Sequence, residues 1–181
     1  ILAGNAYQFV EPRLRGSLLP VNSFILATER LSLSQVASIN PHDLAVCDPN
    51  YVLDYFRLSA DKRLLFGGRC NYSGRIPKSI RAAVEPRMLK VYPQLKGTRI
   101  DYAWGGTLAI TLNRMPCFAR PAENVMSASG FSGHGVAMAT LAGKLMAEAA
   151  RIVCSDGEQA QRSGVEALGL HQAFERLAAQ K

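Results

Sequence analysis

The chain has 181 residues, of which 48% are hydrophobic and 19% charged, and its net charge is +7. This composition is typical of a globular protein with a substantial core, and no apolar run reaches the roughly eighteen residues of a membrane-spanning helix. The basic residues form no dense run and no nucleic-acid module is recognised, so we expect neither a membrane nor a nucleic-acid partner. A solvated surface and an anionic ligand stay open as explanations of the charge.

The first half of the chain predicts short strands. Residues 1–3 are typical of the end of a buried strand, and β-formers predict a strand over 21–28. Residues 31–39 predict a short helix or an irregular excursion. Apolar runs at 51–58 and 63–68 with a four-residue connector predict a hairpin, and the Gly67-Gly68 pair marks a bend or a close approach to a ligand.

The middle of the chain predicts one helix and two strands. Apolar residues at spacings of three and four predict a helix over 79–92, which Pro86 should kink or divide. Alternation predicts a strand over 98–104. Gly105-Gly106 is expected to interrupt it before a second strand at 107–112.

The end of the chain predicts a strand, a glycine-rich turn and a long helix. The strand covers 125–129, the turn 130–135 and the helix 136–153, followed by a tail without assignment. Helix N-termini carry unpaired N–H groups and partial positive charge, and glycines let a ligand approach the backbone. The junction is interpreted either as an ordinary turn or as a site for an anionic or electron-rich ligand.

The cysteines predict no metal site. They lie far apart, with no Cys-x-x-Cys pair, whereas zinc sites use closely spaced ligands. We expect reduced thiols in a cytoplasmic protein, although their even number leaves a disulfide framework open. The four residues are Cys47, Cys70, Cys117 and Cys154.

Several stretches, taken in order, resemble the FAD-dependent D-amino-acid oxidase-like amine oxidoreductases. The resemblance covers about residues 1–153, and the stretches are 1–7, 50–58, 63–68, 92–97, 101–106 and 130–135 with its helix. It implies an α+β chain: an antiparallel-sheet substrate domain plus the strand–turn–helix part of a Rossmann-like FAD-binding domain.

The resemblance also implies domain bounds. Residues 1–10 are expected to end an FAD-domain strand, 11–112 to form the substrate domain and 113–153 to return to the FAD-binding domain, with 154–181 unassigned. The chain contains no Gly-x-Gly-x-x-Gly sequence, so we expect a C-terminal fragment that self-associates through exposed sheet edges.

The implied activity is oxidation of gamma-glutamylputrescine or a related amine to an imine. The imine hydrolyses to an aldehyde, and oxygen becomes hydrogen peroxide. Two alternatives stay open: a sibling oxidoreductase acting on an amino acid or secondary amine, and a catalytically silent binding or assembly module. Any FAD is expected to be noncovalent, because residues 105–108 lack the cysteine of some relatives, and the fragment alone is expected to be inactive and can lack the cofactor. The lysines of other relatives are also missing from 64–66 and 136–138.

The resemblance implies a cofactor set and leaves the catalytic residues unassigned. Backbone N–H groups of residues 133–136 are expected to stabilise negative charge on the flavin. His134 is interpreted as a spacer in the turn or as a general base. The full set is Gly106, Gly130, Ser132, Gly133, His134, Gly135 and Val136.

The substrate set combines aromatic residues with one arginine. Tyr55 and Tyr72 are expected to form an amine-binding wall or to be ordinary sheet residues. Trp104 is expected to line the active site or to fill the core. Arg69 is interpreted as a ligand of a substrate carboxylate or as an exposed hairpin residue.

Overall fold

The computed structural model describes residues 1–7 and 11–163. The chain forms two compact units. Unit 1 comprises residues 1–19 and 109–181, and unit 2 comprises residues 20–108.

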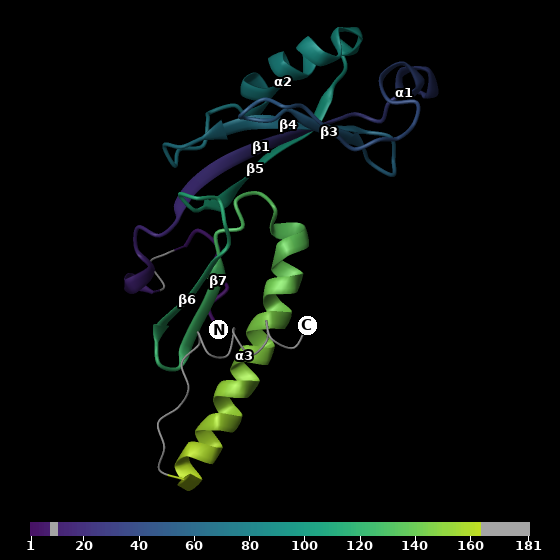
Figure 1. Cartoon of the computed structure of the whole chain (residues 1–181). Helices are drawn as coiled ribbons and strands as arrows, with labels where there is room; N and C mark the ends of the chain where they lie inside the picture. Colours follow the sequence, from purple (N-terminus) through teal and green to yellow (C-terminus); the bar gives the residue numbers. More distant parts are fainter. Residues whose placement is uncertain (8–10, 164–181) are drawn as a thin grey trace. The chain divides into compact units, whose positions relative to one another are not determined.

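Unit 2 is built on a five-stranded sheet with the order β2-β3-β4-β1-β5, drawn in the upper part of Figure 1. Strands β1, β3 and β4 form its centre and pair antiparallel, which agrees with the antiparallel sheet expected from the sequence. The strands are β1 (Leu19–Thr28), β2 (Val46–Cys47), β3 (Tyr55–Leu58), β4 (Leu64–Asn71) and β5 (Ile100–Ile110).

Two helices accompany this sheet. Helix α1 (Leu33–Ile39) begins with a capping box in which Ser32 and Gln35 exchange hydrogen bonds. Helix α2 (Ile80–Val91) contacts β4 and is followed by the 3-10 turn η3 (Pro93–Leu95). Its buried Val84 and Met88 join Phe24, Leu26, Leu58, Leu64 and Phe66 in the core of unit 2. One face of the sheet is therefore covered by α2.

Several sequence predictions for unit 2 are wrong in detail. Pro86 does not divide helix α2, which runs through it as one element, with Val84 and Met88 packed into the core on either side of the proline; the alternative of a kink stays a prediction. Strand β5 runs through Gly105-Gly106 without a break. Residues 51–54 lie outside β3; there the Asp48 carboxylate accepts the N–H groups of Asn50 and Asp54 and forms a turn.

Unit 1 contains a two-stranded antiparallel sheet and a long helix. The sheet consists of β6 (Cys117–Ala122) and β7 (Val125–Ser129), and α3 (Gly135–Ser163) packs against β7. Met126, Met146 and Ala149 form the buried contact between them. The strand predicted at 125–129 is confirmed, whereas α3 extends ten residues beyond the predicted end at Val153, and part of the predicted tail, 164–181, lies outside the described residues.

The start of the chain joins unit 1 through β7. Leu2 forms a parallel bridge to Ser127, and its N–H donates to the Met126 carbonyl at 2.7 Å. The 3-10 turn η2 (Pro12–Leu14) follows. Residues 11–19 and 109–112, which the sequence analysis assigned with the middle region, belong to unit 1, because Leu18 packs with Ala6 and Ala109. Among the described residues, no helix combines the length and apolar character needed to cross a membrane.

Candidate functional site

The glycine-rich turn after β7 has three residues in left-handed backbone conformation. Gly130 has φ +70°, Ser132 +52° and Gly133 +98°. A Cβ on Gly130 would stand 2.5 Å from Thr111 Cγ2 and 2.8 Å from Leu18 Cδ2. Gly130 is therefore required both by its backbone conformation and by its tight packing.

Hydrogen bonds from Ser132 fix the same turn. The Ser132 N–H donates to the Ala109 carbonyl at 3.0 Å, and its hydroxyl donates to the Gly130 carbonyl at 3.1 Å. The Ser132 Oγ also accepts the Thr111 N–H at 3.3 Å. Ser132 was predicted to bind the cofactor. In the structure its side chain is buried, and its hydrogen bonds stabilise the turn.

The second half of the turn is open. Gly133, His134 and Val136 are exposed, and a Cβ on Gly133 would meet nothing within 4 Å. The first helical bond of α3 runs from the Met138 N–H to the His134 carbonyl at 3.0 Å. Gly135 and Val136 are the first residues of α3, so their N–H groups have no acceptor carbonyl within the helix.

These open amides fit an electron-rich or anionic group. The macrodipole of α3 adds partial positive charge at this end, and the glycines leave room for a planar ligand. One expected donor is already used, because the His134 N–H donates to the Phe131 carbonyl at 2.9 Å. His134 itself is exposed. Its interpretation as a spacer in the turn and its interpretation as a general base both stay open.

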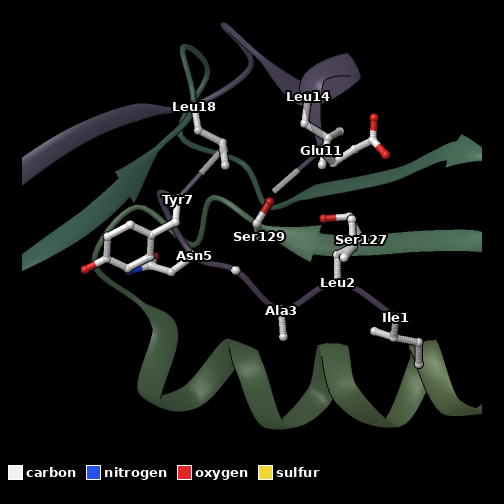
Figure 2. A pocket seen from close by; sticks show the side chains of 11 residues that line it. Ile1, Leu2, Ala3, Asn5, Tyr7, Glu11, Leu14, Leu18, Ser127 and Ser129 are labelled. Carbon is white, nitrogen blue, oxygen red and sulfur yellow. The ribbon is translucent and has the colours of Figure 1, made fainter. Parts of the chain in front are cut away.

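A pocket of about 260 Å³ adjoins the start of this turn in unit 1. Figure 2 shows the first residues of the chain running beside β7, with Ser127 and Ser129 on the strand. Leu18 lines the pocket and also packs on Gly130, which links the two features. The pocket is lined by Ile1, Leu2, Ala3, Gly4, Asn5, Tyr7, Glu11, Leu14, Leu18, Ser127 and Ser129.

These pocket residues were not predicted from the sequence. The available signal was the alternation of the strand at 125–129, which places Ser127 and Ser129 on one face and Met126 on the other. Glu11 brings a charge to the wall: hydrogen bonds from the Arg13 side chain and backbone lower the pKa of the Glu11 carboxyl. The pocket thus combines an apolar floor with polar groups from two segments.

In unit 2, Tyr55 lies over Gly67 of the neighbouring strand. A Cβ on Gly67 would stand 2.4 Å from Tyr55 Cζ, so the glycine lets the ring lie on the strand. The Tyr55 hydroxyl is 3.2 Å from Ser23 Oγ, within hydrogen-bond distance. Both contacts hold the ring against the sheet.

A β-bulge moves Arg69 away from Tyr55. Ile25 pairs with Gly67, but Phe24 pairs with Arg69, so Gly68 is the extra residue. Directly paired residues share a face, so Arg69 lies on the same face of the sheet as Phe24, and its side chain there is exposed. Simple alternation from the sequence would have placed 67 and 69 on one face.

Gly68 itself supports a buried ion pair. Its missing Cβ would stand 2.1 Å from Asp54 Oδ1. The Asp54 carboxylate accepts two hydrogen bonds of 2.6 Å from the Arg87 guanidinium on α2. The Gly67-Gly68 pair is thus explained by packing: one glycine admits an aromatic ring and the other a carboxylate.

The remaining predicted residues of unit 2 are exposed. Trp104 is 44% exposed and Tyr72 is 48% exposed, which does not fit the interpretation of Trp104 as a core residue. A Cβ on Gly106 would meet nothing within 4 Å, whereas one on Gly105 would stand 2.7 Å from Phe24 Cδ1. Gly105 therefore lets β5 lie close to the Phe24 ring, whereas Gly106 borders open space. The roles of all these residues in binding stay predictions.

The chain matches a family model over most of its length. The model, named DAO and described as FAD dependent oxidoreductase, matches residues 1–149. This chain belongs to that family. The predicted family is therefore confirmed.

Two curated relatives are similar over four fifths of the chain. Gamma-glutamylputrescine oxidoreductase of Escherichia coli (strain K12) is 47% identical over 153 residues, covering 83% of this chain and 36% of the relative. Probable oxidoreductase OrdL of Haemophilus influenzae is 46% identical over 154 residues, covering 82% and 35%. The chain thus spans about a third of the length of these relatives.

Two solved structures share the fold. L-proline dehydrogenase from P. horikoshii has a TM-score of 0.63 at 24% identity, over 81% of this chain and 40% of that chain. Glycine oxidase from Geobacillus kaustophilus has a TM-score of 0.58 at 19% identity, over 73% and 35%. Together with the mixed architecture, this confirms the predicted α+β fold class.

Proposed function

We propose that this chain is part of an FAD-dependent oxidoreductase that oxidises the CH–NH or CH–NH2 group of an amine, with gamma-glutamylputrescine or a close analogue as substrate. The 47% identity to the Escherichia coli gamma-glutamylputrescine oxidoreductase supports the substrate class. The open start of α3 is the observation that carries the cofactor part of the proposal. A small-molecule amine and oxygen are the proposed partners, and a cytoplasmic location stays a prediction.

The proposed cofactor is noncovalent FAD, held in part by the turn before α3. When bound, the flavin accepts a hydride equivalent from the carbon beside the amine nitrogen. The amides of Gly133, Gly135 and Val136 would hold the cofactor and stabilise negative charge on it, with the dipole of α3 behind them. Ser132 and Gly130 hold this backbone in place through the hydrogen bonds and packing described above.

Unit 2 is proposed as the substrate domain, with unit 1 as the part that belongs to the FAD-binding domain. Tyr55 supports this assignment, because its ring is fixed by Gly67 and Ser23 and forms an aromatic wall on the face opposite α2. Such a ring attracts a protonated amine through its negative face. Trp104, half exposed on β5, is a second aromatic candidate for the same task.

The first test is the visible absorption spectrum of the chain after addition of FAD and removal of unbound flavin. A retained flavin spectrum supports the cofactor site. A colourless chain favours the alternative of a silent binding or assembly module. The matched variants are Gly133→Ala, which places a methyl group in the open turn, and Gly106→Ala, which adds the same group to β5.

The second test addresses the substrate. Because the chain spans about a third of its relatives, activity is measured in a chimera in which it replaces the matching segment of the Escherichia coli relative. Peroxide release is compared for gamma-glutamylputrescine, putrescine, glycine, proline and sarcosine. Turnover with gamma-glutamylputrescine above the others supports the proposal. Preference for an amino acid or secondary amine supports a sibling activity instead.

A further inference from the structure

One arginine links three segments at an end of the unit 2 sheet. Strand β1 lies between β4 and β5, and Arg63 directly precedes β4. Its Nη1 donates to the Thr28 carbonyl at the end of β1 at 2.9 Å and to Asp101 Oδ2 on β5 at 2.5 Å. Its Nε donates to Asp61 Oδ2, in the turn before β4, at 2.8 Å. The Arg63 side chain is 16% exposed, so these contacts form a largely buried junction.

The same guanidinium lies beside an aromatic ring of β5. Arg63 Cζ is 5.3 Å from the centroid of the Tyr102 ring, within the range of a cation–π contact. Because a positive charge already lies at this ring, a second cation would be attracted to it only weakly. Trp104, two residues further along β5, has no such contact among the described residues. Trp104 is therefore the ring of this strand that is available to a protonated amine.

The part of β5 that carries these two rings has little packing of its own. Residues 102–106 are all exposed, and β5 lies at the edge of the described sheet, with β1 as its neighbour. A segment with few buried apolar contacts opens more readily than the centre of a sheet. The Phe24 ring lies against Gly105 and supports the far end of the stretch. The contacts of Arg63 support its beginning.

We propose that Arg63 is a positioning residue for substrate binding, because it holds the part of β5 that carries Tyr102 and Trp104. The inference rests on the proposed function, in which Trp104 is a candidate to contact the protonated amine. Arg63 acts through the strand and has no contact with the substrate, since its Nε and Nη1 donors are already used within unit 2.

The surroundings of Arg63 allow a variant that still folds. Asp61 also pairs with Arg30, and Asp101 also pairs with Arg99. Arg63→Met therefore leaves neither carboxylate without a cation, but it removes the group that joins them. Arg63→Lys keeps the charge and loses the planar fork that reaches several acceptors at fixed angles. These two variants separate the charge of Arg63 from its geometry.

The first measurement uses the fluorescence of Trp104, which is the one tryptophan of the chain. Arg63→Met should increase the quenching of Trp104 by acrylamide by up to about twofold, since the residue is already 44% exposed. Circular dichroism of the same sample checks that the chain is folded. Arg63→Lys should recover part of the protection. Arg81→Met, which removes a more exposed pair with Glu85 on α2, is the matched control and should leave Trp104 unchanged.

The second measurement is peroxide release by the chimera with the Escherichia coli relative. Arg63→Met should raise the KM for gamma-glutamylputrescine about fivefold with little change in kcat, because a displaced aromatic ring weakens binding of the substrate. Arg63→Lys should give an intermediate KM. Arg81→Met should leave both constants unchanged.

Two results would overturn the inference. One is unchanged quenching of Trp104 in folded Arg63→Met, and the other is increased quenching without a rise in KM, because the arginine would then support the fold alone. A chimera that releases no peroxide even without a substitution contradicts the oxidase proposal alone. In that case the quenching of Trp104 decides by itself whether Arg63 positions β5.

Discussion

The turn in unit 1 and the sheet in unit 2 each contain two kinds of glycine. One kind is in tight contact with neighbouring side chains, and the other borders open space. In unit 1, Gly130 is pressed against Thr111 and Leu18, whereas Gly133 borders open space. In unit 2, Gly67 lies under Tyr55, whereas Gly106 borders open space. In each region, one of these glycines has no room for a Cβ, and the other has room for one.

The difference between the two regions lies in the backbone. Gly133 is open and also has φ +98°, so its conformation is costly for any other residue. Gly106 is open without a left-handed backbone. A glycine held in a special conformation beside the start of a helix is the stronger candidate for contact with a cofactor, and the following predictions separate these cases.

Gly130→Ala should have the largest effect on stability. The new methyl group would clash with Thr111 Cγ2 in a left-handed backbone, and we expect a loss of about 3 kcal/mol in the free energy of unfolding. Urea denaturation of the chain measures it. A loss below about 1 kcal/mol would show that the turn relaxes and is not fixed as described.

Asp54→Asn should lower the free energy of unfolding more than any other loss of an ion pair in unit 2. It removes the charge that the Arg87 guanidinium contacts at 2.6 Å while keeping the shape of the side chain. Because Asp54 is buried and Arg87 is partly exposed, we expect a loss of about 2 kcal/mol, below the value for a fully buried pair. The control is Glu85→Gln, which breaks the more exposed pair with Arg81 and should cost less than about 1 kcal/mol.

Gly133→Ala and Gly106→Ala form the direct comparison of the two open glycines. Strain at φ +98° should cost Gly133→Ala about 1–2 kcal/mol of stability, and the methyl group should also abolish retention of FAD. Gly106→Ala should change stability by less than about 0.5 kcal/mol. Equal FAD retention by both variants would remove the distinction between the two regions.

The smallest expected effect is a change in how the stability depends on pH, through the carboxyl group of Asp61. Hydrogen bonds from Ser59 and Arg63 lower the pKa of Asp61 from 3.8 to about 2. Because the folded pKa is depressed, the stabilisation is complete above pH 3.8 and is lost as pH falls through about 2. Asp61→Asn should therefore flatten the fall of unfolding free energy in that window, measured by denaturation at several pH values. An unchanged slope would show that these bonds are not maintained in solution.

Local patterns in the sequence predicted much of this architecture, and tertiary contacts account for the rest. The strand at 125–129 and the helix at 79–92 carry their signal in apolar spacing. The bulge at Gly68 has no such signal, because it lies against the Asp54 carboxylate of a segment distant in the sequence. For the same reason the sequence did not show that Arg69 pairs with Phe24 and Gly67 with Ile25.

The pocket beside β7 shows the same limit in unit 1. Its residues come from the first turn of the chain, from η2 and from β7, and no local motif joins segments more than a hundred residues apart. The glycine motif, in contrast, was visible in the sequence because a turn followed by a helix start is a local structure. Its open half agrees with the expectation of a ligand-accessible backbone.

The most direct test of the central claim is an FAD titration followed through the backbone amide resonances of the 15N-labelled chain. We predict that the amides of Gly133, Gly135 and Val136 shift with FAD, whereas the amide of Gly74, an open glycine of unit 2 outside the predicted cofactor set, does not. Shifts confined to other regions, or no shift at the start of α3 at saturating FAD, would contradict the assignment of this turn as a cofactor contact.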